Sequence, residues 1–233
     1  MIQIQHLVKR YGDKTVLELP QLEIPDGQIF GLVGNNGAGK TTLFSLLLDL
    51  IQATEGAVKI DEIAVHESED WKTKTAAFLD ETFLIGYLTP EEYFYFIGDL
   101  RGVSKSEVDT LMAGFSDFFS GEILNQKKYI RNLSKGNQKK VGIVATFIGD
   151  PKLLVLDEPF ANLDPTTQIR LKELLKEKSQ VHGRTVLISS HDLQHVTEVC
   201  ERIAVLEKGQ LVQDIVKTPQ TLKDLEAFFA KQI

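Results

Sequence analysis

The sequence predicts an α/β fold with a mainly parallel sheet, because short apolar runs alternate along the chain with amphipathic helical patterns. Three runs are typical of buried strands, and each is followed by a loop and a helical pattern: 29–33, 153–156 and 185–189. The chain has 233 residues, of which 42% are hydrophobic and 25% charged, as expected for one globular domain with room for a small subdomain. This composition excludes intrinsic disorder.

The first 28 residues follow a different pattern. Ile2, Ile4 and His6 alternate, Tyr11-Gly12-Asp13 resembles a turn, and a second run with two nearby prolines covers 17–24. We expect this segment to form an antiparallel β subdomain packed beside the parallel sheet.

Strand signals disappear between residues 87 and 149. One apolar helical stripe occurs there, formed by Val108, Leu111, Met112, Phe115 and Phe119. We therefore expect an α-helical insertion at 87–149 and a core formed by 1–86 and 150–233. Aromatic residues are frequent from 78 to 119, which is compatible both with a hydrophobic core and with an exposed docking surface.

Charge, cysteine content and hydropathy exclude several classes. A net charge of −7 argues against unspecific binding to DNA or anionic lipid, although a local basic patch stays possible. The single cysteine, Cys200, excludes an intrachain disulfide and a cysteine-cluster metal site. The longest apolar stretch, 141–149, is half of the roughly 18 residues that a membrane helix needs, and no signal segment opens the chain. We expect a soluble, cytosolic protein.

Residues 34–41 (GNNGAGKT) match the phosphate-loop pattern G-x-x-x-x-G-K-[ST], after a predicted strand and before a predicted helix at 41–51. Glycines let successive backbone N–H groups point at phosphate oxygens, and the helix N-terminus adds partial positive charge. Lys40 is expected to bridge the β- and γ-phosphates, and the Thr41 hydroxyl to bind Mg²⁺. The alternative is a glycine-rich turn without a ligand.

A second motif is the apolar strand 152–156, which ends in Asp157 and Glu158. Ligands bind at the carboxyl ends of strands in such sheets. Asp157 is expected to hold Mg²⁺ as an oxygen ligand, and Glu158 to act as the general base on water. A solvated strand end is the alternative. Together with the phosphate loop, the pair predicts a P-loop NTPase core.

Three more segments follow in a fixed order: 133–140 (LSKGNQKK), 161–164 (ANLD) and 189–191 (SSH). With these motifs, the whole chain resembles the nucleotide-binding subunits of ATP-binding cassette (ABC) transporters, most closely the short cassettes of bacterial exporters. The three segments look like the family's signature (LSGGQ) motif, D-loop and switch histidine. Lys135 and Asn137 depart from the usual signature, and Glu81 stands where the family's Q-loop usually has glutamine.

The resemblance implies ATP and Mg²⁺ as ligands. Catalysis would involve Glu158, His191 and Lys40, and the metal would be held by Thr41, Asp157 and Glu81. The residues expected to contact ATP are Tyr11, Val16, Gly34, Asn35, Asn36, Gly37, Ala38, Gly39, Lys40, Thr41, Thr42, Ser134, Gly136 and Asp164.

Several of these residues also have a purely structural interpretation. Ser134 and Asp164 are suited to cap helices, and His191 with Asp192 to begin one. Tyr11 could cover a strand at a turn.

The resemblance also implies partners. The chain would work as an ATP-sandwiched cassette dimer, most simply a homodimer, on a separate integral membrane permease at the inner face of the cell membrane. No nucleic-acid partner is expected. Two alternatives are a soluble ABC ATPase acting on nucleic acid or the ribosome, and a regulatory cassette that binds ATP without hydrolysis.

Overall fold

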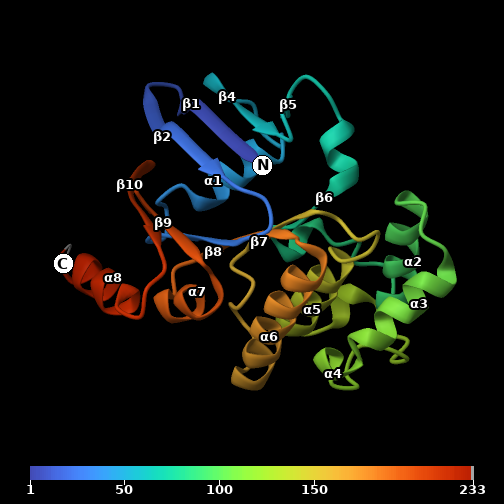
Figure 1. The fold of residues 1–233 in the computed structure, drawn as a ribbon. Coiled ribbons are helices and arrows are strands. Elements are labelled where there is room, and N and C mark those ends of the chain that lie inside the picture. Colours follow the sequence, from blue (N-terminus) through green and yellow to red (C-terminus); the bar gives the residue numbers. More distant parts are fainter. Residues whose placement is uncertain (232–233) are drawn as a thin grey trace.

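The computed structural model describes residues 1–231, apart from the side chains of residues 181 and 182. These residues form one mixed sheet of ten strands in the order β5-β4-β1-β2-β10-β9-β3-β8-β7-β6 (Figure 1). The strands are β1 (Ile2–Tyr11), β2 (Lys14–Ile24), β3 (Ile29–Val33), β4 (Glu55–Ile60), β5 (Ile63–Ala64), β6 (Thr75–Phe78), β7 (Leu153–Asp157), β8 (Thr185–Ser190), β9 (Arg202–Glu207) and β10 (Gln210–Val216).

Helices cover the sheet and fill the segment between β6 and β7. The α-helices are α1 (Lys40–Leu47), α2 (Pro90–Leu100), α3 (Lys105–Gly114), α4 (Ser116–Phe119), α5 (Lys135–Ala145), α6 (Pro165–His182), α7 (Leu193–Val199) and α8 (Thr221–Ala230). The 3-10 helices are η1 (Asp70–Lys74), η2 (Glu81–Phe83) and η3 (Ile130–Asn132).

The sheet has an antiparallel and a parallel part, which confirms the predicted fold class. β1 pairs antiparallel with β2 and β4, whereas β9, β3, β8, β7 and β6 run parallel. The two parts meet where β10 bridges to β2 at Gln210 and Glu18. The carboxyl ends of the parallel strands therefore lie along one edge of the sheet.

Alternating side chains of the parallel strands face two separate cores. In β7, Leu154 and Leu156 belong to the core under α5, α6 and α7, whereas Val155 belongs to the core under α1. Burial of a large apolar side chain stabilises the fold by about 1.5–3 kcal/mol. Because β7 is buried on both faces, the position of its last residue, Asp157, is fixed by the packing of the strand.

The regular structure described between 87 and 149 is helical, and α2, α3 and α4 lie together on the side away from β1 and β2 (Figure 1). The division into 1–86, 150–233 and 87–149 remains a prediction. The predicted apolar stripe does not form one helix, because α3 ends after Gly114 and α4 begins after Phe115.

The helix predicted at 41–51 ends earlier than expected, and α5 ends in a local hydrogen bond. α1 ends at Leu47, because Asp49 adopts the left-handed backbone conformation that closes a helix. α5 ends at Ala145, where the Thr146 hydroxyl bonds back to the Ile143 carbonyl at 2.6 Å.

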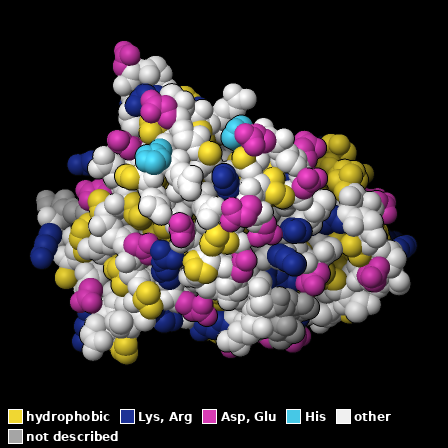
Figure 2. All heavy atoms as spheres, turned by 45° about the horizontal axis from the view of Figure 1, so that its top comes forward, with side chains coloured by type: hydrophobic (Ala, Val, Ile, Leu, Met, Phe, Trp, Pro, Cys, Tyr) yellow, Lys and Arg dark blue, Asp and Glu magenta, His cyan; other side chains and the backbone are white. Residues whose placement is uncertain are grey.

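The aromatic residues between 78 and 119 divide into buried and exposed side chains, so the core interpretation is confirmed for most of them and a docking surface stays a prediction. Most are buried: Phe78, Tyr93, Phe94, Phe115, Phe118 and Phe119. Phe83, Tyr87 and Phe96 are exposed. Within residues 1–231, no helix combines the length and the hydropathy needed to span a membrane. The face in Figure 2 carries acidic and basic side chains intermixed rather than in separate areas.

Candidate functional site

The phosphate loop connects β3 to α1, and two of its glycines are required by the geometry. Gly39, directly before α1, has φ +108°, a conformation that other residues rarely adopt. At Gly34, an added Cβ would lie 2.3 Å from the Leu206 carbonyl oxygen, so the loop can pass β9 only without a side chain. The loop is therefore held tightly against the end of the parallel sheet.

Lys40 is the first residue of α1 and is buried. Its Nζ donates to the carbonyl oxygens of Gly34 at 2.7 Å and Asn35 at 3.4 Å, and so folds back over the loop. The same atom lies 3.5 Å from Oε1 of Glu158. This position places a positive charge in the concave side of the loop, where a phosphate group would lie.

Asp157 ends β7 and is only 4% exposed. Its Oδ2 accepts a hydrogen bond from the Thr41 hydroxyl at 2.5 Å, and its Oδ1 accepts one from the Ser189 hydroxyl. Burial raises the pKa of Asp157 and outweighs these two hydroxyl donors; the neighbouring Glu158 carboxylate also raises it. Thr41 and Asp157 together offer the hard oxygen ligands that Mg²⁺ prefers, so the site fits that ion.

Glu158 has a left-handed backbone with φ +46°, which is uncommon outside glycine. Its N–H donates to the Ser189 hydroxyl oxygen at 2.9 Å. Its carboxylate lies between two basic groups, with Oε1 near Lys40 and Oε2 3.0 Å from Nδ1 of His191. His191 itself is exposed, at the end of β8. The acidic pair therefore separates, with Asp157 buried and Glu158 turned toward the phosphate loop.

A cavity of about 300 Å³ lies at this edge of the sheet. Its lining combines both predicted motifs: Val16, Asn36, Gly37, Gly39, Lys40, Thr41, Thr42, Asp157 and Glu158. A neighbouring cavity adds Asn35 and Ala38 and is closed on its other side by Phe229 of α8. Tyr11 is outside both linings and is 56% exposed, with Nζ of Lys9 4.7 Å from its ring centre.

The signature segment lies outside this cavity. Ser134 caps α5, because its hydroxyl accepts from the Asn137 N–H at 3.2 Å. Gly136 packs on the D-loop, where an added Cβ would lie 2.8 Å from the Asn162 carbonyl oxygen. Asp164 caps α6 through the Thr167 N–H at 3.0 Å. The structural interpretations of Ser134 and Asp164 are thus confirmed, and their predicted contact with ATP stays a prediction.

Glu81 lies at the start of η2 and is 11% exposed. Its Oε1 is 3.5 Å from Nζ of Lys139, on α5. The structure thus brings Glu81 to a lysine rather than to Thr41 or Asp157, and its role as a metal ligand stays a prediction. Among residues 1–231, no cluster of three or more His, Cys, Asp or Glu side chains could hold a metal.

Two polar residues of the site were missed by the sequence analysis. Ser189 pairs with Asp157 in the β7–β8 register, and its hydroxyl contacts both members of the acidic pair. Its position at a strand end, two residues before His191, was the available signal. Lys139 donates to the Glu158 carbonyl oxygen at 2.8 Å. Its signal was its place in the segment 133–140, next to a continuous apolar run.

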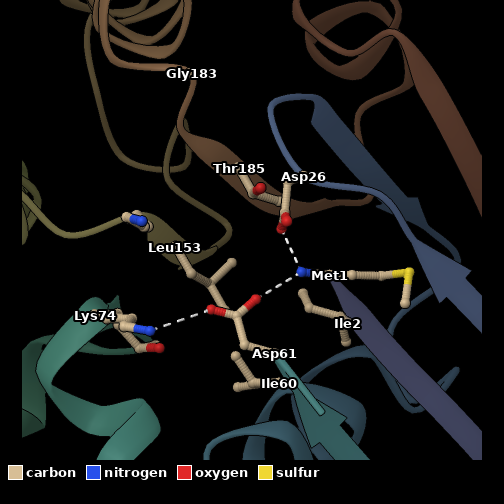
Figure 3. Close-up of a pocket in the computed structure, with 11 residues that line it drawn as sticks. Met1, Ile2, Asp26, Ile60, Asp61, Lys74, Leu153, Gly183 and Thr185 are labelled. Carbon is tan, nitrogen blue, oxygen red and sulfur yellow. Dashed lines mark hydrogen bonds and ion pairs between the residues drawn. The ribbon is translucent and has the colours of Figure 1, made fainter.

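A second cavity, of about 230 Å³, lies at the opposite edge of the sheet. Figure 3 shows the Met1 amino group between Asp26 and Asp61, with Lys74 also reaching Asp61. Leu153 and Thr185 line it where β7 and β8 begin. This cavity is therefore separate from the phosphate loop.

A strand, a glycine loop closed by Lys40 and a buried acidic strand end define the class of P-loop nucleotide-binding proteins. Comparison with known proteins gives the family: residues 17–161 match the ABC transporter family. This chain belongs to that family.

Individual relatives and a solved structure support the same family. "Uncharacterized ABC transporter ATP-binding protein YhaQ" of Bacillus subtilis is 34% identical over 242 residues, covering 100% of this chain and 75% of its own length. "Lantibiotic transport ATP-binding protein SrtF" of Streptococcus pyogenes is 31% identical over 237 residues, covering 100% of this chain and 97% of its own. A solved "ATP binding subunit of ABC transporter" is 26% identical with a TM-score of 0.85, covering 99% of this chain and 93% of its own.

Proposed function

We propose that this chain is the ATP-hydrolysing subunit of a membrane exporter. The observation that carries the proposal is the Glu158 carboxylate, held between Lys40 at 3.5 Å and His191 at 3.0 Å beside the phosphate loop. SrtF, which is similar over the full chain, is named for lantibiotic transport, and this supports an export role.

The chain's own groups fit the hydrolysis of ATP to ADP and phosphate. Lys40 would bind the β- and γ-phosphates in place of the backbone carbonyls that it now contacts. Thr41 and Asp157 would hold Mg²⁺, which neutralises phosphate charge when it is bound. Glu158 would accept a proton from the attacking water, and His191 would orient that carboxylate through Oε2.

The second half of each ATP site would come from another cassette, most simply a second copy of this chain. Ser134 and Gly136 do not line the cavity of their own chain, yet they stand at the N-terminus of α5. Such a helix end is suited to an anion. A dimer would place this end over the partner's γ-phosphate, with Asp164 at the subunit boundary.

A permease at the inner face of the membrane would contact the exposed side chains that follow β6. Phe83, Tyr87 and Leu100 are more than half exposed, and Phe96 is partly so. Apolar side chains in that number on one segment favour a protein partner. Purification from native membranes tests this: a co-purifying integral membrane protein supports the proposal, and a ribosome or DNA in its place contradicts it.

Hydrolysis is tested by measuring phosphate release with MgATP for the wild type and for Glu158→Gln. The amide keeps the size of the side chain but cannot accept the proton, so we expect kcat to fall about 10²–10⁴-fold while ATP binding is kept. Glu226→Gln, an exposed position on α8, is the matched control. Wild-type turnover by Glu158→Gln would exclude the general-base role.

The shared site is tested by mixing two inactive variants, Ser134→Arg and Lys40→Ala. In a mixed dimer, one of the two composite sites carries neither substitution, so we expect part of the wild-type activity to return. Each variant alone should stay inactive. Mixed dimers that are detected but inactive would contradict the arrangement in which Ser134 serves the partner's nucleotide.

A further inference from the structure

Two adjacent lysines on α5 are almost completely buried, Lys139 with 5% and Lys140 with 3% exposure. Buried amino groups are rare and costly unless they are paired. The Nζ of Lys140 lies 3.9 Å from the Oε2 of Glu122, its carboxylate partner. Lys139 contacts both a carboxylate, that of Glu81, and a backbone carbonyl, that of Glu158. The second contact suggests a role in the site.

The amino group of Lys139 joins three segments. It donates to the Glu158 carbonyl oxygen at 2.8 Å, just beyond β7, and lies 3.5 Å from Glu81 on η2. Its own position is fixed, because α5 packs directly on β6. An added Cβ at Gly142 would lie 2.1 Å from the Phe78 ring, and the Lys139 Nζ lies 6.0 Å from the centre of the same ring.

The backbone that Lys139 holds is a strained one. Glu158 has φ +46°, a conformation that a non-glycine residue keeps only where its surroundings enforce it. Its carbonyl oxygen has a second donor, the Ala161 N–H at 3.2 Å, which closes a turn. Lys139 is the donor that comes from outside this turn, so it ties the turn to α5.

Lys139 is also the charge partner of Glu81. Its Oε1 is buried and, among the described residues, has no hydrogen-bond partner, so Lys139 provides its charge partner. Removing Lys139 would therefore have two separate effects. It would leave a buried carboxylate unpaired, and it would release the Glu158 carbonyl.

We propose that Lys139 is a positioning residue for hydrolysis: by holding the Glu158 carbonyl, it keeps the strained backbone that aims the Glu158 carboxylate at the phosphate loop. The proposal rests on the function proposed above, in which Glu158 is the general base. Lys139 acts through Glu158 and lies outside the nucleotide cavity. Its loss should therefore lower kcat and leave the affinity for ATP nearly unchanged.

The test compares Lys139→Met, which keeps the stem and removes the amino group, with the double variant Lys139→Met/Glu81→Gln. The double variant has no unpaired buried carboxylate but still lacks the donor to Glu158. We expect Lys139→Met to lower both the melting temperature and kcat, with kcat falling about 10–100-fold. In the double variant, the melting temperature should recover while kcat stays low.

Lys140→Met is the matched control, because it removes the neighbouring buried amino group without touching Glu158. It should lower the melting temperature and change kcat less than about threefold. Lys139→Arg keeps a donor and should retain more kcat than Lys139→Met. The dissociation constant for ATP should stay within about threefold of the wild type in every folded variant, and amide exchange in 157–163 should accelerate only where the donor is lost.

The outcomes separate the two proposals. If kcat recovers together with the melting temperature in the double variant, or if Lys139→Met and Lys140→Met lose kcat equally, the positioning role is wrong. If Lys139→Met does not fold, the double variant and Lys139→Arg decide the question. Wild-type turnover by Glu158→Gln would instead overturn the proposed function itself.

Discussion

The two edges of the parallel sheet use charged residues in opposite ways. At the carboxyl edge, burial raises the pKa of Asp157. At the amino edge, a hydrogen bond from the Met1 amino group, aided by Lys74, lowers the pKa of Asp61. The charge of Asp157 thus has a cost in the ligand-free chain, whereas the charge of Asp61 stabilises the fold. The difference indicates which edge is built to receive a ligand.

The largest expected effect at the carboxyl edge is that of Lys40→Ala. Removing the amino group takes the positive charge from the phosphate loop, so we expect ATP affinity to fall at least tenfold and turnover to disappear. The free energy of unfolding without ligand should change by about 1–2 kcal/mol, because the lost contacts are two carbonyl hydrogen bonds and the ion pair with Glu158. Isothermal titration with ATP and denaturant unfolding measure the two quantities. A large loss of stability with intact ATP binding would reverse the assignment of this edge.

The counterpart at the amino edge is Arg184→Met. Arg184 is buried and donates to the carbonyl oxygens of Pro151 at 2.7 Å and Lys178 at 3.2 Å, and to Asp150. Leaving such acceptors unpaired should lower the free energy of unfolding by about 2–4 kcal/mol.

ATP affinity of folded Arg184→Met should match the wild type, because the substitution lies at the edge opposite the phosphate loop. Thermal unfolding with and without ATP gives both values in one experiment. Weak ATP binding by the folded variant would show that the two edges are coupled.

The smallest expected effect concerns stability against pH for Asp157→Asn and Asp61→Asn. The raised pKa of Asp157 means that its contribution to stability falls as pH rises from the ordinary value of 3.8 through its higher folded value. The lowered pKa of Asp61 means that its contribution is present above 3.8 and is lost as pH falls through its lower folded value.

At neutral pH, Asp157→Asn should therefore stabilise the ligand-free chain and Asp61→Asn should destabilise it, each by about 1 kcal/mol or less. The Asp157→Asn difference should shrink toward pH 4, as the wild-type Asp157 carboxyl group is protonated, whereas the Asp61→Asn difference should persist at pH 4 and shrink only below pH 3.8. Denaturant unfolding at pH 7 and pH 4 provides the comparison. Changes of the same sign at pH 7 would remove the contrast between the edges.

The sequence was sufficient to predict the fold class and the two motifs of the carboxyl edge. Both consist of local signals: a buried strand, the glycine loop at 34–41, and the paired carboxylates after β7. The parallel pairing of the strands then brings Lys40 and Glu158 together, and no additional motif is needed to predict this contact. Contacts that follow from strand order are accessible to sequence reasoning.

Contacts that depend on how helices pack were not accessible. Lys139 belongs to the site because Gly142 lets α5 lie on Phe78, an approach of a helix backbone to an aromatic ring that no local pattern encodes. The division of the stripe at Phe115 and the early end of α1 likewise result from single backbone conformations. The pairing of Glu81 with Lys139 could not be foreseen without the position of α5.

The phosphate loop is supported by parts of the chain that are synthesised long after the loop itself. Its β3 stem lies between β8 and β9, Gly34 rests against the Leu206 carbonyl, and Ala38 accepts a hydrogen bond from the Gly209 N–H at 2.9 Å. Ribosomes add about 5–20 residues per second, so on the order of ten seconds passes between the synthesis of the loop and that of its support. A nascent chain of 200 residues already contains Lys40, Asp157, Glu158 and His191. It lacks Leu206 and Gly209, which contact the loop at Gly34 and Ala38. The phosphate loop can therefore reach its supported geometry only after β9 and Gly209 have been synthesised.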